Sequence, residues 1–181
     1  MKRISEIALR LLVFAITFVL VVGLTLPIIS KVLAAGETVQ VRLDASQIQP
    51  RSLEQLTGQS ITKTYSNAWK NLEAGLAENR PDLIAESFVG YAHDKLLSQV
   101  KEQQKAGLTT RYVDHGHQVS ATFYSPEGSS VQLQDTAQLE IQLLDDSRIV
   151  SSQNVTRKYI AVVTVVEDSW KVRVLDAVQA F

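Results

Sequence analysis

The residues whose types and spacing favour chemistry are those of the segment Asp114-His115-Gly116-His117. Residues two apart on a strand point to the same face, so His115 and His117 are expected to have the relation of a two-histidine metal pair. Asp114 joins them only if the strand bends at Gly116, and a solvated hairpin edge explains the same residues. Two ligands do not make a site, so we predict neither a metal nor a cofactor.

Composition excludes several classes of mechanism. The chain has no cysteine, which removes disulfides, thiolate nucleophiles and cysteine-ligated zinc or iron–sulfur sites. No phosphate-binding glycine loop, dinucleotide fingerprint or Ser/His/Asp order is present. The 18 Lys and Arg residues are balanced by 19 Asp and Glu residues and are scattered, so we predict no nucleic-acid binding.

Two further sets of side chains are candidates for binding. One is a set of aromatic residues expected between helices and sheet, where plain core packing is the alternative to a pocket for a small apolar or lipid-like ligand. The other is a row of glutamines on one strand face, which is wet but uncharged and is either an interaction face or a solvated monomer surface. The pocket set is Tyr65, Trp69, Phe88, Tyr112, Tyr159 and Trp170, and the interaction face is Gln132, Gln134, Gln138 and Gln142.

A membrane segment precedes these residues. From Leu11 to Ser30 there are 20 uncharged residues, which as a helix span ~30 Å of hydrocarbon. Three basic residues come before this run and only Lys31 follows closely, so the N-terminus is predicted to be cytoplasmic and the rest periplasmic or otherwise extracytoplasmic. We expect residues 1–35 to be an anchor in the inner, cytoplasmic membrane. A signal peptide cleaved before Ala35 is the alternative, although its apolar region would be unusually long.

Residues 36–58 carry Gly, Pro and polar residues and are expected to be a stalk, with one short alternating stretch at Val39, Val41 and Leu43. Helical spacing of apolar residues predicts a long helix from Gln59 to about residue 79. Two shorter helices are predicted, the first opening at Pro81 and the second running from Tyr91 to Ala106, with Gly107 as its cap.

After Thr109 the apolar period changes from 3.6 to 2, which predicts about four antiparallel strands over residues 118–123, 131–143, 155–166 and 170–178. The run from Ile160 to Val166 is apolar on both faces, so this strand is expected to lie centrally and to be partly covered on both sides. Residues 59–181 therefore form one α+β domain, with three helices on one face of a curved sheet.

This order of elements, ending in a turn before Trp170-Lys171-Val172, resembles the nuclear transport factor two-like superfamily. The resemblance implies a cone-shaped α+β fold behind an N-terminal transmembrane helix. The membrane-anchored members that it resembles are periplasmic subunits of type IV secretion systems, Mce-associated proteins and a domain of chloroplast and cyanobacterial division proteins.

Enzymes of this superfamily, such as ketosteroid isomerases and dehydratases, place an Asp or His base and a Tyr donor in the mouth of the cone. Residues suitable by type are Tyr65, Tyr91, His93, Tyr112 and Asp114. The middle of each inward strand face, however, is predicted from the sequence to be wholly apolar, so we expect no ionisable group there and no catalytic residue.

We therefore expect a non-catalytic, single-pass membrane-anchored interaction module that binds a protein partner or itself. The alternative is a pocket protein that binds or transforms a small apolar or lipid-like molecule.

Overall fold

The computed structural model describes residues 39–178 of the 181-residue chain. These residues form three helices and six strands, which confirms the predicted α+β class. The elements are β1 (Val41–Asp44), β2 (Gln49–Pro50), α2 (Gln55–Ala77), α3 (Pro81–Ser87), α4 (Gly90–Ala106), β3 (Leu108–Tyr124), β4 (Ser130–Asp145), β5 (Arg148–Val166) and β6 (Ser169–Ala177).

The three helices lie where the apolar spacing predicted them, although α2 begins four residues before Gln59. Its buried side chains recur every three or four residues and include Ile61, Tyr65, Trp69 and Leu72, so a single stripe faces the sheet. The N-terminus of α3 is at Pro81, which lacks the N–H that a first helical turn leaves unpaired. Gly107 caps α4 in the left-handed conformation, with φ of 68°.

The sheet is mixed and has the order β1-β3-β4-β5-β6, with β2 also beside β3. The four long strands are antiparallel, as predicted, but β1 and β2 pair with β3 in parallel. Residues 41–44 and 49–50 had been expected to belong to a stalk, and that expectation is wrong for them because their backbone hydrogen bonds are made inside the sheet. Only the alternating stretch around Val41 indicated β1.

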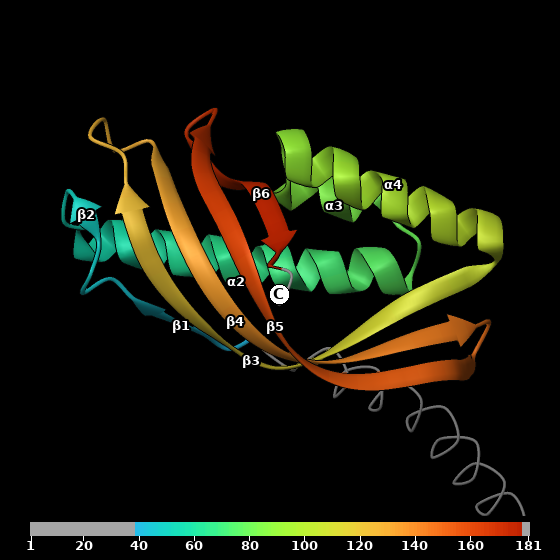
Figure 1. The fold of residues 1–181 in the computed structure, drawn as a ribbon. Coiled ribbons are helices and arrows are strands. Elements are labelled where there is room, and N and C mark those ends of the chain that lie inside the picture. The colour runs from blue at the N-terminus through green and yellow to red at the C-terminus, as the bar shows by residue number, and fades with distance from the viewer. Residues whose placement is uncertain (1–38, 179–181) are drawn as a thin grey trace, which may run out of the picture. The chain divides into compact units, whose positions relative to one another are not determined.

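The sheet curves around α2, and α3 and α4 lie on the same concave side (Figure 1). Register shifts between Asp114 and Gly116 and between Ala121 and Phe123 mark two bulges in β3. Further shifts occur in the β4–β5 and β5–β6 pairs. Bulges bend a strand and increase its twist, so these positions account for the curvature that lets the sheet wrap around one helix.

Strand β5 lies between β4 and β6, which confirms its predicted central position. Its inward residues Ala161 and Val163 are fully buried, whereas Ile160 on the opposite face is 37% exposed. On that outward face Val162 and Val166 are half-buried, so the predicted partial cover of both faces is confirmed for them, although all three helices pack on the concave side.

No helix within residues 39–178 is long and apolar enough to cross a membrane. The predicted span from Leu11 to Ser30 lies outside the described residues.

The contact between α2 and α3 depends on Gly75. A Cβ on Gly75 would lie 2.8 Å from Ile84 Cδ1 and 3.2 Å from the Arg80 carbonyl oxygen. We expect Gly75→Val to lower the free energy of unfolding by about 1–3 kcal/mol through overpacking. The control is Gly58→Ala on the same helix, whose Cβ would meet only Leu53 at ordinary distance and which is expected to add about 0.5–1 kcal/mol. Urea unfolding followed by circular dichroism measures both, and an unchanged midpoint for Gly75→Val would contradict the close packing.

Candidate functional site

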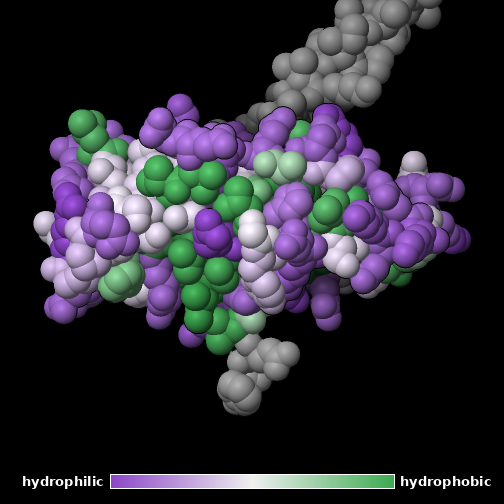
Figure 2. Space-filling model, turned by 90° about the horizontal axis from the view of Figure 1, so that it is seen from above, coloured by the Kyte–Doolittle hydropathy of each residue, from purple (hydrophilic) through white to green (hydrophobic). Residues whose placement is uncertain are grey.

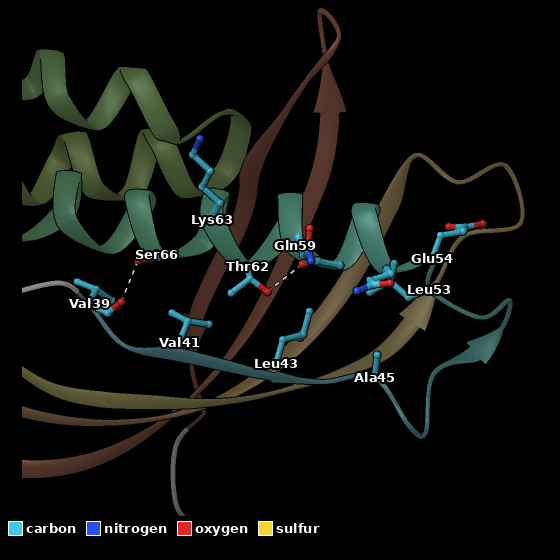
Figure 3. Close-up of a pocket in the computed structure, with 12 residues that line it drawn as sticks. Val39, Val41, Leu43, Ala45, Leu53, Glu54, Gln59, Thr62, Lys63 and Ser66 are labelled. Atoms are coloured by element: carbon cyan, nitrogen blue, oxygen red, sulfur yellow. Dashed lines mark hydrogen bonds between the residues drawn. The ribbon is translucent and has the colours of Figure 1, made fainter.

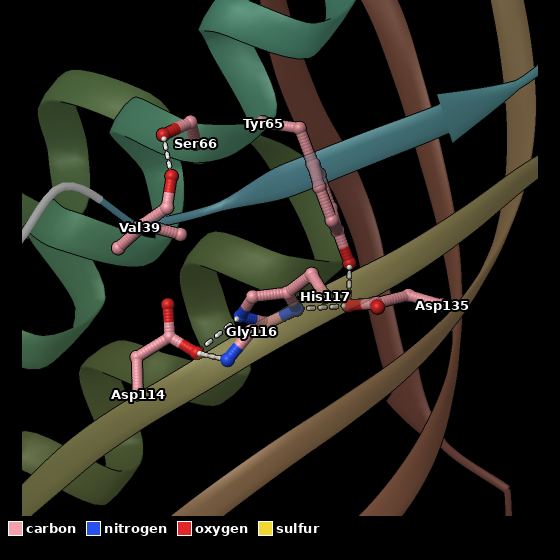
Figure 4. A network of polar contacts seen from close by, with 7 residues as sticks. All are labelled: Val39, Tyr65, Ser66, Asp114, Gly116, His117 and Asp135. Atoms are coloured by element: carbon pink, nitrogen blue, oxygen red, sulfur yellow. Dashed lines mark hydrogen bonds and ion pairs between the residues drawn. The ribbon is translucent and has the colours of Figure 1, made fainter.

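A network of polar side chains is buried between α2 and the sheet (Figure 4). The Tyr65 hydroxyl donates to Asp135 Oδ2 at 2.8 Å, and His117 Nδ1 lies 2.7 Å from the same oxygen. Since a carboxylate oxygen accepts, the second contact places a proton on Nδ1. The side chains of His117 and Asp135 have no exposed surface. The imidazole of His117, the carboxylate of Asp135 and the phenol of Tyr65 therefore contact one another in the buried interior.

The bulge in β3 determines which histidine joins this network. Tyr112 and Asp114 face inward before the bulge, and His117 and Val119 face inward after it, because the extra residue His115 shifts the alternation by one. The predicted common face for His115 and His117 is thus wrong. Asp114 Oδ1 accepts the Gly116 N–H at 2.7 Å and lies 3.5 Å from His117 Nε2.

Asp135 is the residue that sequence reasoning missed. The expectation of no ionisable group on the inward strand faces is wrong, since Asp135 and His117 both lie there with 1% and 2% exposure. A strict period of 2 along β4 would have found Asp135, which shares its parity with the buried Val131, Leu133, Ala137 and Leu139. No comparable signal indicated His117, because its side depends on the bulge.

Burial determines the electrostatics of the tyrosines. The pKa of Tyr65 is raised well above its usual value, first by burial and then by the negative charge of Asp135. Burial likewise raises the pKa of Tyr112, and it raises the pKa of Tyr159 to about 12. Asp135 Oδ1 and His117 Nε2 are buried and lack a hydrogen-bond partner.

Most of the predicted pocket set fills the space under α2. Trp69 is 1% exposed, and its ring centroid lies 4.4 Å from that of His117 and 5.2 Å from that of Tyr159. Tyr65 and Tyr112 contact the same indole at 6.4 Å. Phe88 is also buried but lies at the end of α3 beside Val172 of β6, and Trp170 packs half-buried against the core. The indole therefore covers the polar network.

A groove of about 540 Å³ opens between β1 and the N-terminal half of α2 (Figure 3). Val41 and Leu43 of β1, and Ala45 just after the strand, face the helix across it, while Gln59 and Thr62 line the helix side. The Ser66 hydroxyl donates to the Val39 carbonyl at 2.9 Å and closes one end. None of the six residues predicted to line a pocket lines this groove.

The predicted glutamine row lies on the convex face of β4, opposite the helices. Gln134 and Gln138 are exposed, while Gln132 and Gln142 are half-buried and bond to Thr122 and Glu140. The four glutamines therefore share one face of β4, and the role of this face in association stays a prediction. Of the other suitable residues, Tyr91 is exposed on α4 and His93 contacts only its neighbour Asp94 among the described polar groups.

Apolar side chains also gather on the surface, where Figure 2 shows a band of them between polar regions. Single exposed apolar residues are normal on a soluble surface and do not make a site by themselves. Over the whole described surface, the exposed large apolar residues are Leu56, Tyr91, Phe123, Ile149, Val150, Ile160, Val165 and Val178. Among residues 39–178 no group of three or more His, Asp or Glu side chains is arranged to hold a metal ion.

The fold is shared with proteins of known structure. The intermembrane space region of chloroplast protein ARC6 matches with a TM-score of 0.60 and 17% identity, over 72% of this chain and 100% of that one. A hexachlorocyclohexane dehydrochlorinase (LinA) type 2 matches with a TM-score of 0.50 and 10% identity, over 71% and 90%. These likenesses show the cone-shaped nuclear transport factor two-like fold and confirm the predicted resemblance.

No protein-family model and no curated protein matches the sequence. The two structures named above differ in kind, since one is an enzyme and the other is titled as a region of a chloroplast protein. Function must therefore be argued from the site and not from the fold.

The raised pKa of Tyr65 predicts a pH dependence of stability. The phenol stays protonated in the folded chain at a pH where the unfolded chain has lost the proton, at about 10 and above. The contribution is therefore fully present below pH 10, and the free energy of unfolding falls as pH rises beyond it. Tyr65→Phe should weaken this fall and should also cost about 1–3 kcal/mol at neutral pH, because Asp135 loses a donor.

Urea unfolding at several pH values between neutral and alkaline conditions measures this effect. The matched control is Tyr91→Phe, because Tyr91 is 56% exposed. This substitution is expected to change neither the free energy of unfolding at neutral pH nor its decrease at alkaline pH. An equal alkaline slope in the Tyr65→Phe variant and the parent protein would refute the assignment.

Proposed function

We propose that the protein is a non-catalytic interaction module, anchored in the inner membrane by residues 11–30, whose extracytoplasmic domain binds a segment of a partner protein in the β1–α2 groove. The observation that carries this proposal is the contrast between the two candidate sites. The groove is an open apolar depression on the surface, whereas the polar network lies beneath the indole of Trp69.

The buried network argues for a structural role and against catalysis. A general base must come within hydrogen-bond reach of its substrate. Tyr65, His117 and Asp135 are each at most 2% exposed, and the rings of Tyr65 and Trp69 on α2 contact His117. The buried hydrogen bond from Tyr65 of α2 to Asp135 of β4 helps to fix the register between the helix and the sheet.

The groove has the anatomy of a site for an extended peptide. Aliphatic side chains form its floor, and Glu54, Gln59 and Lys63 form a polar rim. Strand β1 pairs with β3 on one side and with no described strand on the other, so its free edge offers backbone groups to an added strand. Alternate side chains of such a partner would enter the apolar floor.

Sequence supports the placement near a membrane. Residues 31–38 separate the end of the uncharged run from Val39, and a chain of that length reaches at most about 30 Å. Val39 itself lines the groove. The similar ARC6 region is titled as belonging to an intermembrane space, a compartment bounded by membranes.

Membrane anchoring is tested by fractionation. We expect the full chain to remain in the membrane pellet after carbonate extraction and its C-terminal domain to be protected from external protease until the outer barrier is opened. Both results follow from an uncleaved span with a cytoplasmic N-terminus. A soluble mature chain that begins at Ala35 would show that the segment is a signal peptide.

Partner binding is tested by placing a photo-crosslinking amino acid at Leu43 in the groove. We expect a discrete adduct with a protein in native membranes, and its loss when Val41→Glu puts a charge on the apolar floor. The control position is Val150 on β5, which is 47% exposed and does not line the groove. Equal labelling from both positions, or none from Leu43, would refute the peptide site.

The second candidate function is binding of a small apolar or lipid-like molecule in the same groove. Its aliphatic floor and its volume of about 540 Å³ favour this, since small-molecule sites of ~300–1,000 Å³ are mainly apolar. A Leu43 adduct whose added mass is that of a lipid would support this candidate, and an adduct joining two copies of the chain would show self-association.

A further inference from the structure

The convex face of the sheet carries a polar hollow that the groove does not touch. It has a volume of about 190 Å³ and lies at the bulge of β3, between β1 and β4. A second hollow of about 260 Å³ adjoins it over β4 and β5 and shares His115 and Gln138 with it. The polar residues that line the first are Gln40, Arg42, His115, His117, Gln118, Thr136 and Gln138, with the His117 side chain turned inward, and the second adds Asn154 and Thr156.

Strand register brings these residues together from four strands. Arg42 is opposite Gln118, Gln118 is opposite Thr136, and Thr136 is opposite Lys158. The next row is formed by Gly116, Gln138 and Thr156. Adjacent strands lie ~4.8 Å apart, so each row places polar side chains side by side on the convex face. The bulge turns His115 outward, and Gly116 beside it lacks a Cβ, which leaves space between the rows.

Several side chains of this hollow have no hydrogen-bond partner among the described residues. Within residues 39–178, Arg42 makes no hydrogen bond or ion pair, whereas Arg51, Arg80 and Arg148 each bond a carboxylate. The side chains of Gln118 and Gln138 have no described hydrogen-bond partner either. A guanidinium beside several free amides is an arrangement that can recognise a ligand at no cost to internal contacts.

Charge selects the class of ligand. Neither hollow is lined by Asp or Glu. The carboxylates around it have other partners: Asp44 accepts the Ser46 N–H, Asp114 accepts the Gly116 N–H, and Asp135 contacts His117 on the concave side. Glu140, which interacts with His115, accepts from the Ser152 hydroxyl at 2.6 Å and the Gln142 amide at 2.8 Å. None of these carboxylates bonds Arg42, and a guanidinium binds phosphate oxygens in pairs.

We propose that these two hollows bind a compact phosphate ester that carries hydroxyl groups. Arg42 and His115 hold the phosphate, while Gln138, Asn154 and Thr156 bond the hydroxyls in the adjoining hollow. Each hollow alone is smaller than the ~300 Å³ at which drug-sized sites begin, so each holds one small part of the ligand, the phosphate in the first and the hydroxyl-bearing part in the second. A soluble glycerol phosphate and the glycerophosphate headgroup of a lipid share this chemistry. The site is independent of the groove and does not rest on it.

The test uses the full chain in nanodiscs of phosphatidylcholine, titrated calorimetrically with glycerol 3-phosphate. We expect saturable binding that Arg42→Gln weakens at least tenfold and that Asn154→Ala weakens by a smaller factor. Arg148→Gln is the matched control, because Arg148 lies at the far end of β5 and bonds only Asp145 among the described residues. Circular dichroism confirms that the variants fold.

Three results would overturn the proposal: no binding, equal binding by the Arg42→Gln variant, or an equal loss in the Arg148→Gln variant. Inorganic phosphate and glycerol, titrated separately, should each bind more weakly than the ester, and equal affinity for inorganic phosphate would refute the hydroxyl contacts. Adding phosphatidylglycerol to the nanodiscs distinguishes the sources. A lower apparent affinity for glycerol 3-phosphate supports a lipid headgroup, and an unchanged affinity supports a soluble ester.

Discussion

The packing of α2 into the concave face of the sheet is the contact on which the rest of the domain depends. Trp69 lies at its centre, with His117, Tyr159, Tyr65 and Tyr112 around the indole. Such aromatic pairs add ~0.5–1.5 kcal/mol each beyond the area that they bury. The contact also excludes water from the Asp135 carboxylate, which is stabilised by the Tyr65 hydroxyl and the His117 ring. One face of α2 thus supplies both the indole of Trp69, which covers the network, and the Tyr65 hydroxyl, which bonds the Asp135 carboxylate.

The bulge of β3 connects the two faces of the sheet. It turns His117 inward to Asp135 and His115 outward to the polar hollow, although these residues are only two apart. The backbone N–H of His117 also donates to the Gln40 carbonyl at 2.9 Å, which holds the segment before β1 beside the bulge of β3. A single extra residue therefore shapes the buried network, the position of the edge strand and the convex surface.

The long, strongly periodic elements could be predicted from the sequence, since each presents one apolar face to the same core. Pro81 and Gly107 fixed two helix ends for local reasons. Strands β1 and β2 could not be fully predicted, because they span only four and two residues and are held by pairing with β3, which is distant in sequence. The alternation along β4 places Asp135 on the inward face, but inward positions were expected to be apolar, so this buried carboxylate was not predicted.

The sequence by itself determined the class of the domain and the side chains that its core would use, because burial of apolar residues with a period of 3.6 or 2 is a local pattern. It also determined the uncharged run from Leu11 to Ser30. Tertiary structure alone decided that His117 meets Asp135, that Trp69 fills the interior, and that the open site lies at β1. Those outcomes depend on strand register, on a bulge and on contacts between distant residues, and no local spacing encodes them.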